Sequence, residues 1–125
     1  MALILVVDDD ERICLLLKTR LQMMKHEVLI AESAESGLRK IFWHKPDLII
    51  LDIRLPSRDG LSMLKEIKGS NRSKYTPVIV LSGAGDKETK GAAYRDYAEE
   101  FLDKPVDFKK LEAVIQRVLL AKLPA

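Results

Sequence analysis

The chain has 125 residues, of which 47% are hydrophobic and 32% are charged. This length fits one folded domain with its own core and leaves no room for a second folded unit. The formal net charge is only +2, with both signs interspersed, which argues against nucleic-acid binding by this domain.

The sequence also lacks the usual signals for membranes and secretion. No apolar run reaches the length of a membrane span, and residues 1–7 have no basic region before their apolar run. We therefore interpret the N-terminus as a strand and not as a signal peptide. Cys14 is the only cysteine and cannot form an internal disulfide, which is typical of a protein in the reducing cytoplasm. We expect it on or beside the buried face of the first helix.

Short apolar runs without polar alternation recur along the chain, as expected for strands that are covered on both faces of a sheet. These runs are residues 2–7, 28–30, 48–51, 78–81 and 101–102. Segments with apolar residues at helical spacing lie between the strands and after the last one. Their apolar positions are Ile13, Leu16, Leu17, Leu21 and Met24; Ala34, Leu38, Ile41 and Phe42; Leu61, Leu64 and Ile67; and Phe108, Leu111, Ile115, Val118 and Leu119.

Two helices have recognisable starts and one has weak support. Asp10 is expected to cap the first helix and Asp107 the last, because a carboxylate accepts the free amides of a first turn. The segment 87–97 carries Gly91 in its middle and shows no wide apolar stripe, so it is the weakest predicted helix. The alternation of strands and helices predicts an α/β protein with a doubly wound, five-stranded parallel sheet and helices on both faces.

Four charged residues follow predicted strands: Asp8, Asp9, Asp52 and Lys104. The carboxyl ends of parallel strands meet at one end of the sheet, where open α/β sheets bind ligands. Two carboxylates about 4 Å apart repel by roughly 4 kcal/mol at an effective dielectric near 20, so a cluster of three favours a bound cation. Oxygen ligands with open positions suit Mg²⁺. The tripeptide Asp8-Asp9-Asp10 alone fits a solvated acidic loop equally well.

Three further motifs mark the predicted strand ends. The loop after Asp52 contains Pro56 and Gly60, which stiffen it and allow a tight start to the next helix. Ser82 ends a strand and is followed by small residues, although taken alone it fits a simple turn cap better. In the Phe101-Leu102-Asp103-Lys104-Pro105 segment, the lysine at the strand end is followed by a proline, which is also a weak signal on its own.

Together, at these spacings, the four motifs resemble the receiver domain of two-component response regulators. The resemblance covers residues 1–121, and we expect 122–125 to be a tail or the start of a linker. It implies a flavodoxin-like strand order of 2-1-3-4-5. After Leu119 only six residues remain. We therefore expect either a stand-alone receiver or a domain cut from a larger regulator or hybrid kinase.

The resemblance also implies a phosphoacceptor and a metal site. Asp52 would accept the phosphoryl group, and Asp9 and Asp52 would be the direct Mg²⁺ ligands. The backbone carbonyl of Arg54 would complete the protein's share of the metal shell. Asp8 would act mainly through metal-bound water.

Further implied roles concern the switch and its partners. Ser82 matches the family's switch hydroxyl, which follows the phosphoryl group, and Lys104 matches the cationic partner of that group. Phe101 matches the aromatic residue whose rotamer responds to phosphorylation. The implied phosphodonor is a sensor histidine kinase or a phosphotransfer protein, with no membrane partner. We also expect that the fourth helix, fifth strand and last helix form the surface read by a partner or a second copy. The segment 87–97, the Ser82 loop and Phe101 should change most on activation, as Phe101 turns inward.

The chain would be a switch with only slow self-catalysed phosphorylation and dephosphorylation. The chain departs from the family at two positions. It has Tyr97 where the family commonly has glycine, and Phe101 where tyrosine is common. One alternative is a Mg²⁺-dependent aspartyl-phosphate phosphatase, but such an enzyme places a second aspartate where this chain has Arg54. Another is an interaction module that needs no phosphorylation. Such modules typically lose the acceptor, the acid pair or the lysine, and all of them are present here.

Overall fold

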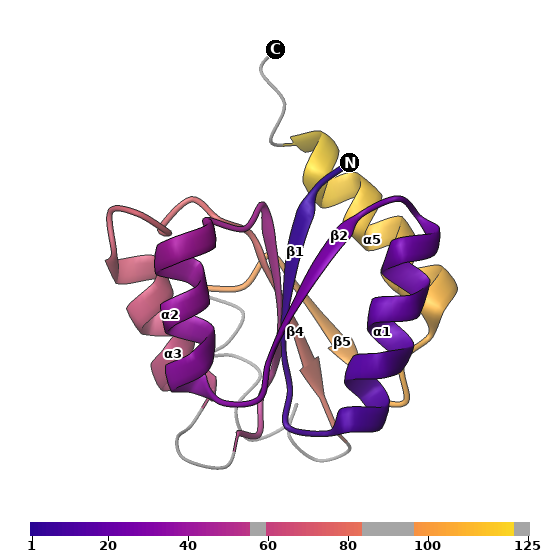
Figure 1. Cartoon of the computed structure of the whole chain (residues 1–125), viewed down its shortest axis with the longest axis horizontal. Helices are drawn as coiled ribbons and strands as arrows, with labels where there is room; N and C mark the ends of the chain where they lie inside the picture. Colours follow the sequence, from indigo (N-terminus) through magenta and orange to yellow (C-terminus); the bar gives the residue numbers. More distant parts are fainter. Residues whose placement is uncertain (56–59, 84–96, 122–125) are drawn as a thin grey trace.

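Five parallel strands form one sheet at the centre of the protein (Figure 1). The structure is a computed structural model, which describes residues 1–55, 60–83 and 97–121. The strands are β1 (Leu3–Val7), β2 (Glu27–Ala31), β3 (Leu48–Asp52), β4 (Val78–Ser82) and β5 (Glu100–Asp103). Their order is β2-β1-β3-β4-β5, which confirms the predicted sheet, and each strand agrees with its apolar run to within one residue at each end.

Helices cover both faces of the sheet, as predicted (Figure 1). Helices α1 (Glu11–Met23) and α5 (Phe108–Ala121) pack on one face, and α2 (Ala34–His44) and α3 (Gly60–Gly69) on the other. The predicted helix 87–97 lies outside the described residues except for Tyr97. Within the described ranges, no helix combines the length and apolar character that a membrane crossing requires.

The two predicted helix caps are confirmed. The Asp10 carboxylate accepts hydrogen bonds from the amides of Arg12 and Ile13, at 2.9 and 3.4 Å. Asp107 accepts from two amides in the first turn of α5, at 3.1 and 3.2 Å. Both caps stand directly after the loops that follow a strand, so they fix where these loops end.

The buried faces of two helices differ from the predicted stripes. Leu16 was expected to be buried but is 54% exposed, whereas Cys14 is buried with Leu17 and Leu21. The buried set recurs every three or four residues, and Leu16 lies one position off that face. Phe42 on α2 is likewise one position off the buried face and is 46% exposed, whereas its neighbour Ile41 is buried. Burial of Cys14 beside the sheet is as predicted.

β2 is an edge strand, and one of its outward carbonyl groups is covered. The Ala31 carbonyl accepts from the Asp8 amide on the β1 side, so the preceding Ile30 carbonyl points to the outer edge. The ammonium of Lys40 on α2 donates a hydrogen bond to this Ile30 carbonyl. A side chain therefore occupies a position where another strand would otherwise pair.

Candidate functional site

Asp52 is the last residue of β3, a strand buried over its whole length. β3 pairs with β1 on one side and with β4 on the other, and Asp52 aligns with Leu81. The Asp52 carboxyl is 5% exposed and accepts a hydrogen bond from the Arg54 amide at 3.2 Å. A central strand therefore presents this carboxylate on a rigid support at the carboxyl end of the sheet.

Asp8 and Asp9 stand in the loop between β1 and α1, and their environments differ. Asp8 is 1% exposed, and its Oδ1 accepts from the Asp10 amide at 2.9 Å. Its backbone carbonyl also accepts a hydrogen bond from the Cys14 thiol at 3.2 Å. Asp9 is exposed. One carboxylate of the pair is thus fixed inside the protein, while the other faces solvent.

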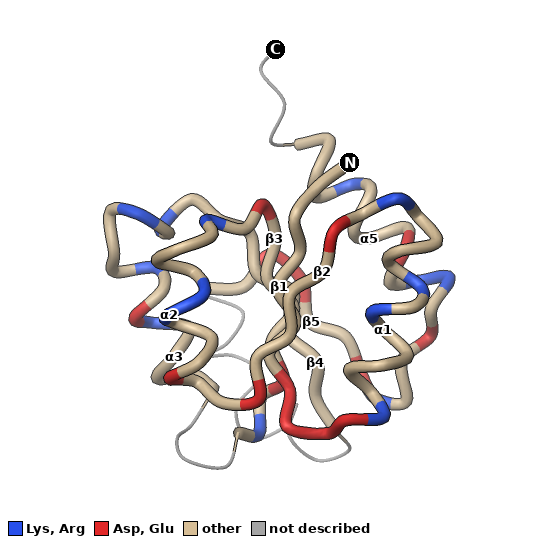
Figure 2. Tube along the Cα trace, in the orientation of Figure 1, with Lys and Arg blue, Asp and Glu red and all other residues tan. Residues whose placement is uncertain are grey.

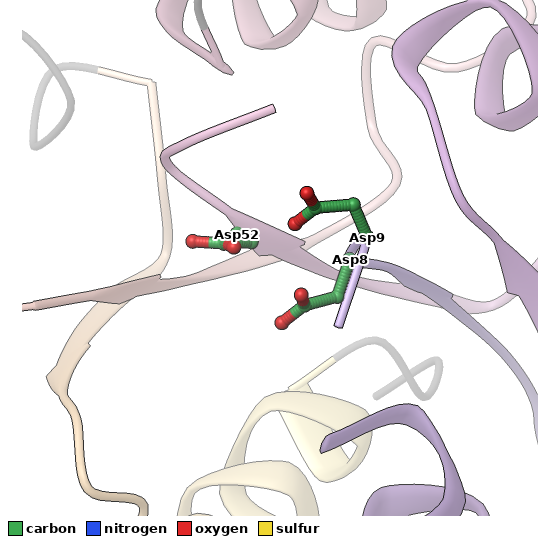
Figure 3. Close-up of side chains that lie close together, drawn as sticks. All are labelled: Asp8, Asp9 and Asp52. Atoms are coloured by element: carbon green, nitrogen blue, oxygen red, sulfur yellow. The ribbon is translucent and has the colours of Figure 1, made fainter. Parts of the chain in front are cut away.

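The structure brings the three predicted carboxylates together (Figure 3). One oxygen each of Asp8, Asp9 and Asp52 lies within 4.8 Å of the others. Two come from the loop after β1 and the third from the end of β3, so the parallel pairing of these two strands creates the cluster. This acidic cluster could bind a metal ion, because hard oxygen ligands around a common space suit a divalent cation.

Lys104 adds a positive charge to the same cluster. Its Nζ lies 3.1 Å from Asp52 Oδ2 and 3.5 Å from Asp8 Oδ2. The Lys104 amide donates to the Ser82 carbonyl at 2.6 Å, which ties the residue after β5 to the end of β4. The pairing of β4 with β5 therefore places the Lys104 ammonium beside the carboxylates of Asp8 and Asp52, as the sequence predicts.

Comparison with known proteins identifies the family. The family model described as "Response regulator receiver domain" matches residues 4–116. The chain belongs to this family. A solved response regulator receiver domain protein from Clostridium thermocellum has a TM-score of 0.89 and 34% sequence identity, with 98% of this chain and 97% of that chain covered. Fold and sequence therefore agree on a receiver domain of two-component response regulators.

Curated relatives are longer than this receiver domain. The transcriptional regulatory protein ZraR of Escherichia coli (strain K12) is 34% identical over 116 residues, which cover 93% of this chain and 26% of ZraR. The alkaline phosphatase synthesis transcriptional regulatory protein PhoP of Bacillus subtilis (strain 168) is 31% identical over 93% of this chain and 48% of PhoP. The chain thus spans about a quarter to a half of the length of these relatives.

The charges in the receiver site shift two pKa values. Burial of the Asp8 carboxyl is the largest cause that raises its pKa, from 3.8 to about 6, and the nearby Asp52 charge adds to this effect. The Asp10 amide and Lys104 act in the opposite direction. Burial alone would lower the pKa of Lys104, but the charges of Asp52 and Asp8 outweigh it and raise that pKa. The ammonium is therefore held in its charged form.

Ser82 ends β4 at the same end of the sheet, with its side chain fully buried. Its Oγ makes no hydrogen bond within the part of the chain that the structure describes. An unpaired buried hydroxyl costs free energy, so this one is available for a ligand.

Two other predicted residues lie nearby. Phe101 is 9% exposed and belongs to the core cluster on the face of the sheet that α2 and α3 cover. Its role as a switch stays a prediction. The Arg54 side chain is exposed two residues after Asp52, and metal binding by its carbonyl also stays a prediction.

Sequence reasoning missed how closely the segment after Asp52 packs on α3. A Cβ added to Gly60 would lie 2.7 Å from the carbonyl oxygen of Ile53 and 3.1 Å from that of Asp52. The Gly60 amide also donates to the Ile53 carbonyl at 3.2 Å. Gly60 was expected to allow a tight start to the helix, but its close approach to the Asp52 and Ile53 carbonyls has no signal in the sequence.

Proposed function

We propose that this receiver domain accepts a phosphoryl group on Asp52, with Mg²⁺ as cofactor, and then switches its interaction surface. One observation carries the proposal: three carboxylates share a space within 4.8 Å, and an ammonium lies 3.1 Å from Asp52. A phosphoryl group needs positive charge on its oxygens and an aligned nucleophile. The arrangement supports both requirements.

The donor set fits Mg²⁺ by its chemistry. Asp9 and Asp52 would be direct ligands with the Arg54 carbonyl, and the buried Asp8 would act through water. Only Asp9 of the three carboxylates is exposed, which leaves one side of the cluster open to solvent. When bound, Mg²⁺ supplies positive charge that offsets the charge on the phosphoryl oxygens.

Asp52 would be the nucleophile in the transfer. Its carboxylate oxygen forms a bond to phosphorus while the phosphorus–nitrogen bond of a donor phosphohistidine breaks. The electron pair of that bond stays on the imidazole, which takes up a proton, and Asp52 becomes an acyl phosphate. A carboxylate nucleophile has no proton to lose, so no general base is required. Lys104 would pair with a phosphoryl oxygen in place of a carboxylate.

The buried Ser82 hydroxyl would report the phosphorylation. Its Oγ has no partner among the described residues, and an acyl phosphate on Asp52 offers new acceptor oxygens. A hydrogen bond formed only in the phosphorylated state biases a two-state equilibrium toward that state. Movement of the loop after Ser82 and a response of Phe101 would carry the change to the surface of β5 and α5.

The proposed donor is a sensor histidine kinase or a phosphotransfer protein that meets this domain in the cytoplasm. A second copy is the proposed partner on the surface of the fourth helix, β5 and α5, of which the structure describes β5 and α5. On that face the Arg117 guanidinium lies 2.6 Å from the Glu100 carboxylate, which joins the strand to the helix. Changes on β5 would thereby reach α5.

The test is incubation with Mg²⁺ and acetyl phosphate, followed by intact-protein mass spectrometry. The wild-type chain should gain a hydroxylamine-labile phosphoryl group, and Asp52→Asn should gain none. Asp107→Asn is the matched control, because asparagine caps a helix as well as aspartate does and the residue lies outside the cluster. Undiminished labelling of Asp52→Asn would refute the assignment. Rapid turnover of acetyl phosphate would favour the phosphatase alternative.

A further inference from the structure

A basic and aromatic surface lies at the end of the sheet opposite the carboxylates. We call it the α2–α3 surface, because it joins the C-terminal end of α2 to the turn after α3. Its exposed members are Phe42, Trp43, Lys45, Arg72, Lys74 and Tyr75. Figure 2 shows blue segments in this region, and the red loop after β1 at the other end of the sheet.

One ring contact joins the two segments of this surface, and two more lie within the segments. The Arg72 guanidinium lies 4.3 Å from the centroid of the Phe42 ring. The Trp43 ring meets Phe42 edge-on, with centroids 5.1 Å apart, yet Trp43 remains 75% exposed. Tyr75 is 83% exposed, with Lys74 Nζ 5.1 Å from its ring. Tryptophan, tyrosine and arginine are the residues that carry most binding energy in protein interfaces.

The charges of this surface have one sign. Residues 36–46 and 67–77 contain no aspartate or glutamate. Their lysines and arginines are Arg39, Lys40, Lys45, Lys68, Arg72 and Lys74. Lys40 and Lys68 donate to backbone carbonyl groups, and Lys68 also pairs with the Glu99 carboxylate at 3.0 Å, so its charge is already offset. The other four are exposed. Acidic residues flank these ranges at Glu35, Asp47 and Glu66, and the Asp47 carboxylate accepts a hydrogen bond from the Leu3 amide at 2.8 Å. The surface therefore offers positive charge beside exposed rings.

We infer that the α2–α3 surface binds an acidic protein segment that also carries an apolar side chain. The apolar side chain would pack on Trp43, and carboxylates would pair with Arg72 and Lys74. The Phe42 ring supports the Arg72 guanidinium, so less side-chain freedom is lost when its planar fork meets a carboxylate. A net charge of +2 and four exposed cations are too little for strong attraction to a long nucleic acid.

The test measures fluorescence anisotropy of a labelled synthetic peptide in which glutamate and leucine alternate. The wild-type chain should bind it, with weaker binding at higher salt, and a peptide with glutamine in place of glutamate should not bind. Trp43 is the only tryptophan, so its emission should shift on binding and locate the contact. Asp52→Asn should bind as tightly as wild type, which separates this inference from the proposed phosphorylation.

Matched variants decide the location. Trp43→Ala and Arg72→Gln should each weaken binding by about tenfold or more, as expected for truncated interface anchors. The controls Met23→Ala and Lys18→Gln remove an exposed apolar side chain and an exposed charge from α1, and should change binding less than about twofold. Equal losses in variants and controls, or tighter binding of a single-stranded oligonucleotide than of the peptide, would overturn the inference.

Discussion

Replacing the buried Asp8 by asparagine should stabilise the metal-free protein at neutral pH. Asp8 is 1% exposed, and burial raises its pKa from 3.8 to about 6. Asparagine keeps the Oδ1 that accepts from the Asp10 amide, and the change removes the negative charge together with its ion pair to Lys104 Nζ, 3.5 Å away. The two pKa values differ by about 2, and each pH unit corresponds to about 1.4 kcal/mol. Ionisation of Asp8 should therefore cost the folded state about 3 kcal/mol.

The sign of the pH dependence follows from proton binding. Between pH 3.8 and about 6 the folded wild-type chain binds more protons at Asp8 than the unfolded chain does, so this group lowers stability as pH rises. Below that range Asp8 is protonated in both states, and Asp8→Asn should have little effect. Above it the full difference between variant and wild type should be present.

The assay is urea unfolding at several pH values, without metal and with Mg²⁺. Glu32→Gln is the control, because it removes an exposed charge near the same loop. Saturating Mg²⁺ should stabilise the wild type and shrink the advantage of Asp8→Asn, since a cation offsets the repulsion between carboxylates. A variant that is less stable than wild type at pH 7, or a difference that stays constant between pH 4 and pH 7, would refute this reasoning.

Three further predictions concern residues in and around the carboxylate cluster. Ser82→Ala should raise the free energy of unfolding by about 1 kcal/mol, and Ser73→Ala should lower it by about as much, because the buried Ser73 hydroxyl donates to a carbonyl at 2.7 Å. Urea unfolding tests both, and the same sign in both would contradict the argument. Gly60→Ala should lower the free energy of unfolding by about 1–3 kcal/mol and slow phosphorylation. Gly69→Ala should be neutral or stabilising, because no atom lies within 4 Å of its added Cβ. Equal effects of the two substitutions on the free energy of unfolding would count against this prediction. Lys104→Ala should leave Mg²⁺ affinity intact or raise it while uncoupling phosphorylation from the conformational response, and weaker Mg²⁺ binding in calorimetry would exclude this role.

The sequence was sufficient to predict the strands, which apolar runs mark, and the site residues that directly follow them. Five apolar runs gave five strands, and the position of Asp52 and Lys104 after such runs was enough to bring them together. Residues that follow parallel strands lie at the same end of the sheet, so the proximity of Asp52 and Lys104 can be predicted without knowing how side chains pack.

The helix faces were harder because three leucines stand in a row at 15–17. Only Leu17 of the three is buried, since the face is set by packing on the sheet and not by composition. The different burial of Asp8 and Asp9 was also not predictable from their order in the chain. In the folded protein the Asp8 carboxylate accepts from the Asp10 amide, and the Asp8 carbonyl accepts from the Cys14 thiol on α1, whereas Asp9 is exposed.

The contact between Lys40 and the Ile30 carbonyl has a consequence for association between molecules. β2 ends the sheet, and an open strand edge is a template on which a strand of another molecule can pair. The Lys40 ammonium already occupies the Ile30 carbonyl on that edge, and a second strand would have to displace a charged donor before it could form its ladder. The side chain thus works against edge-to-edge aggregation. Acetylation of this lysine would remove the charge and weaken that protection.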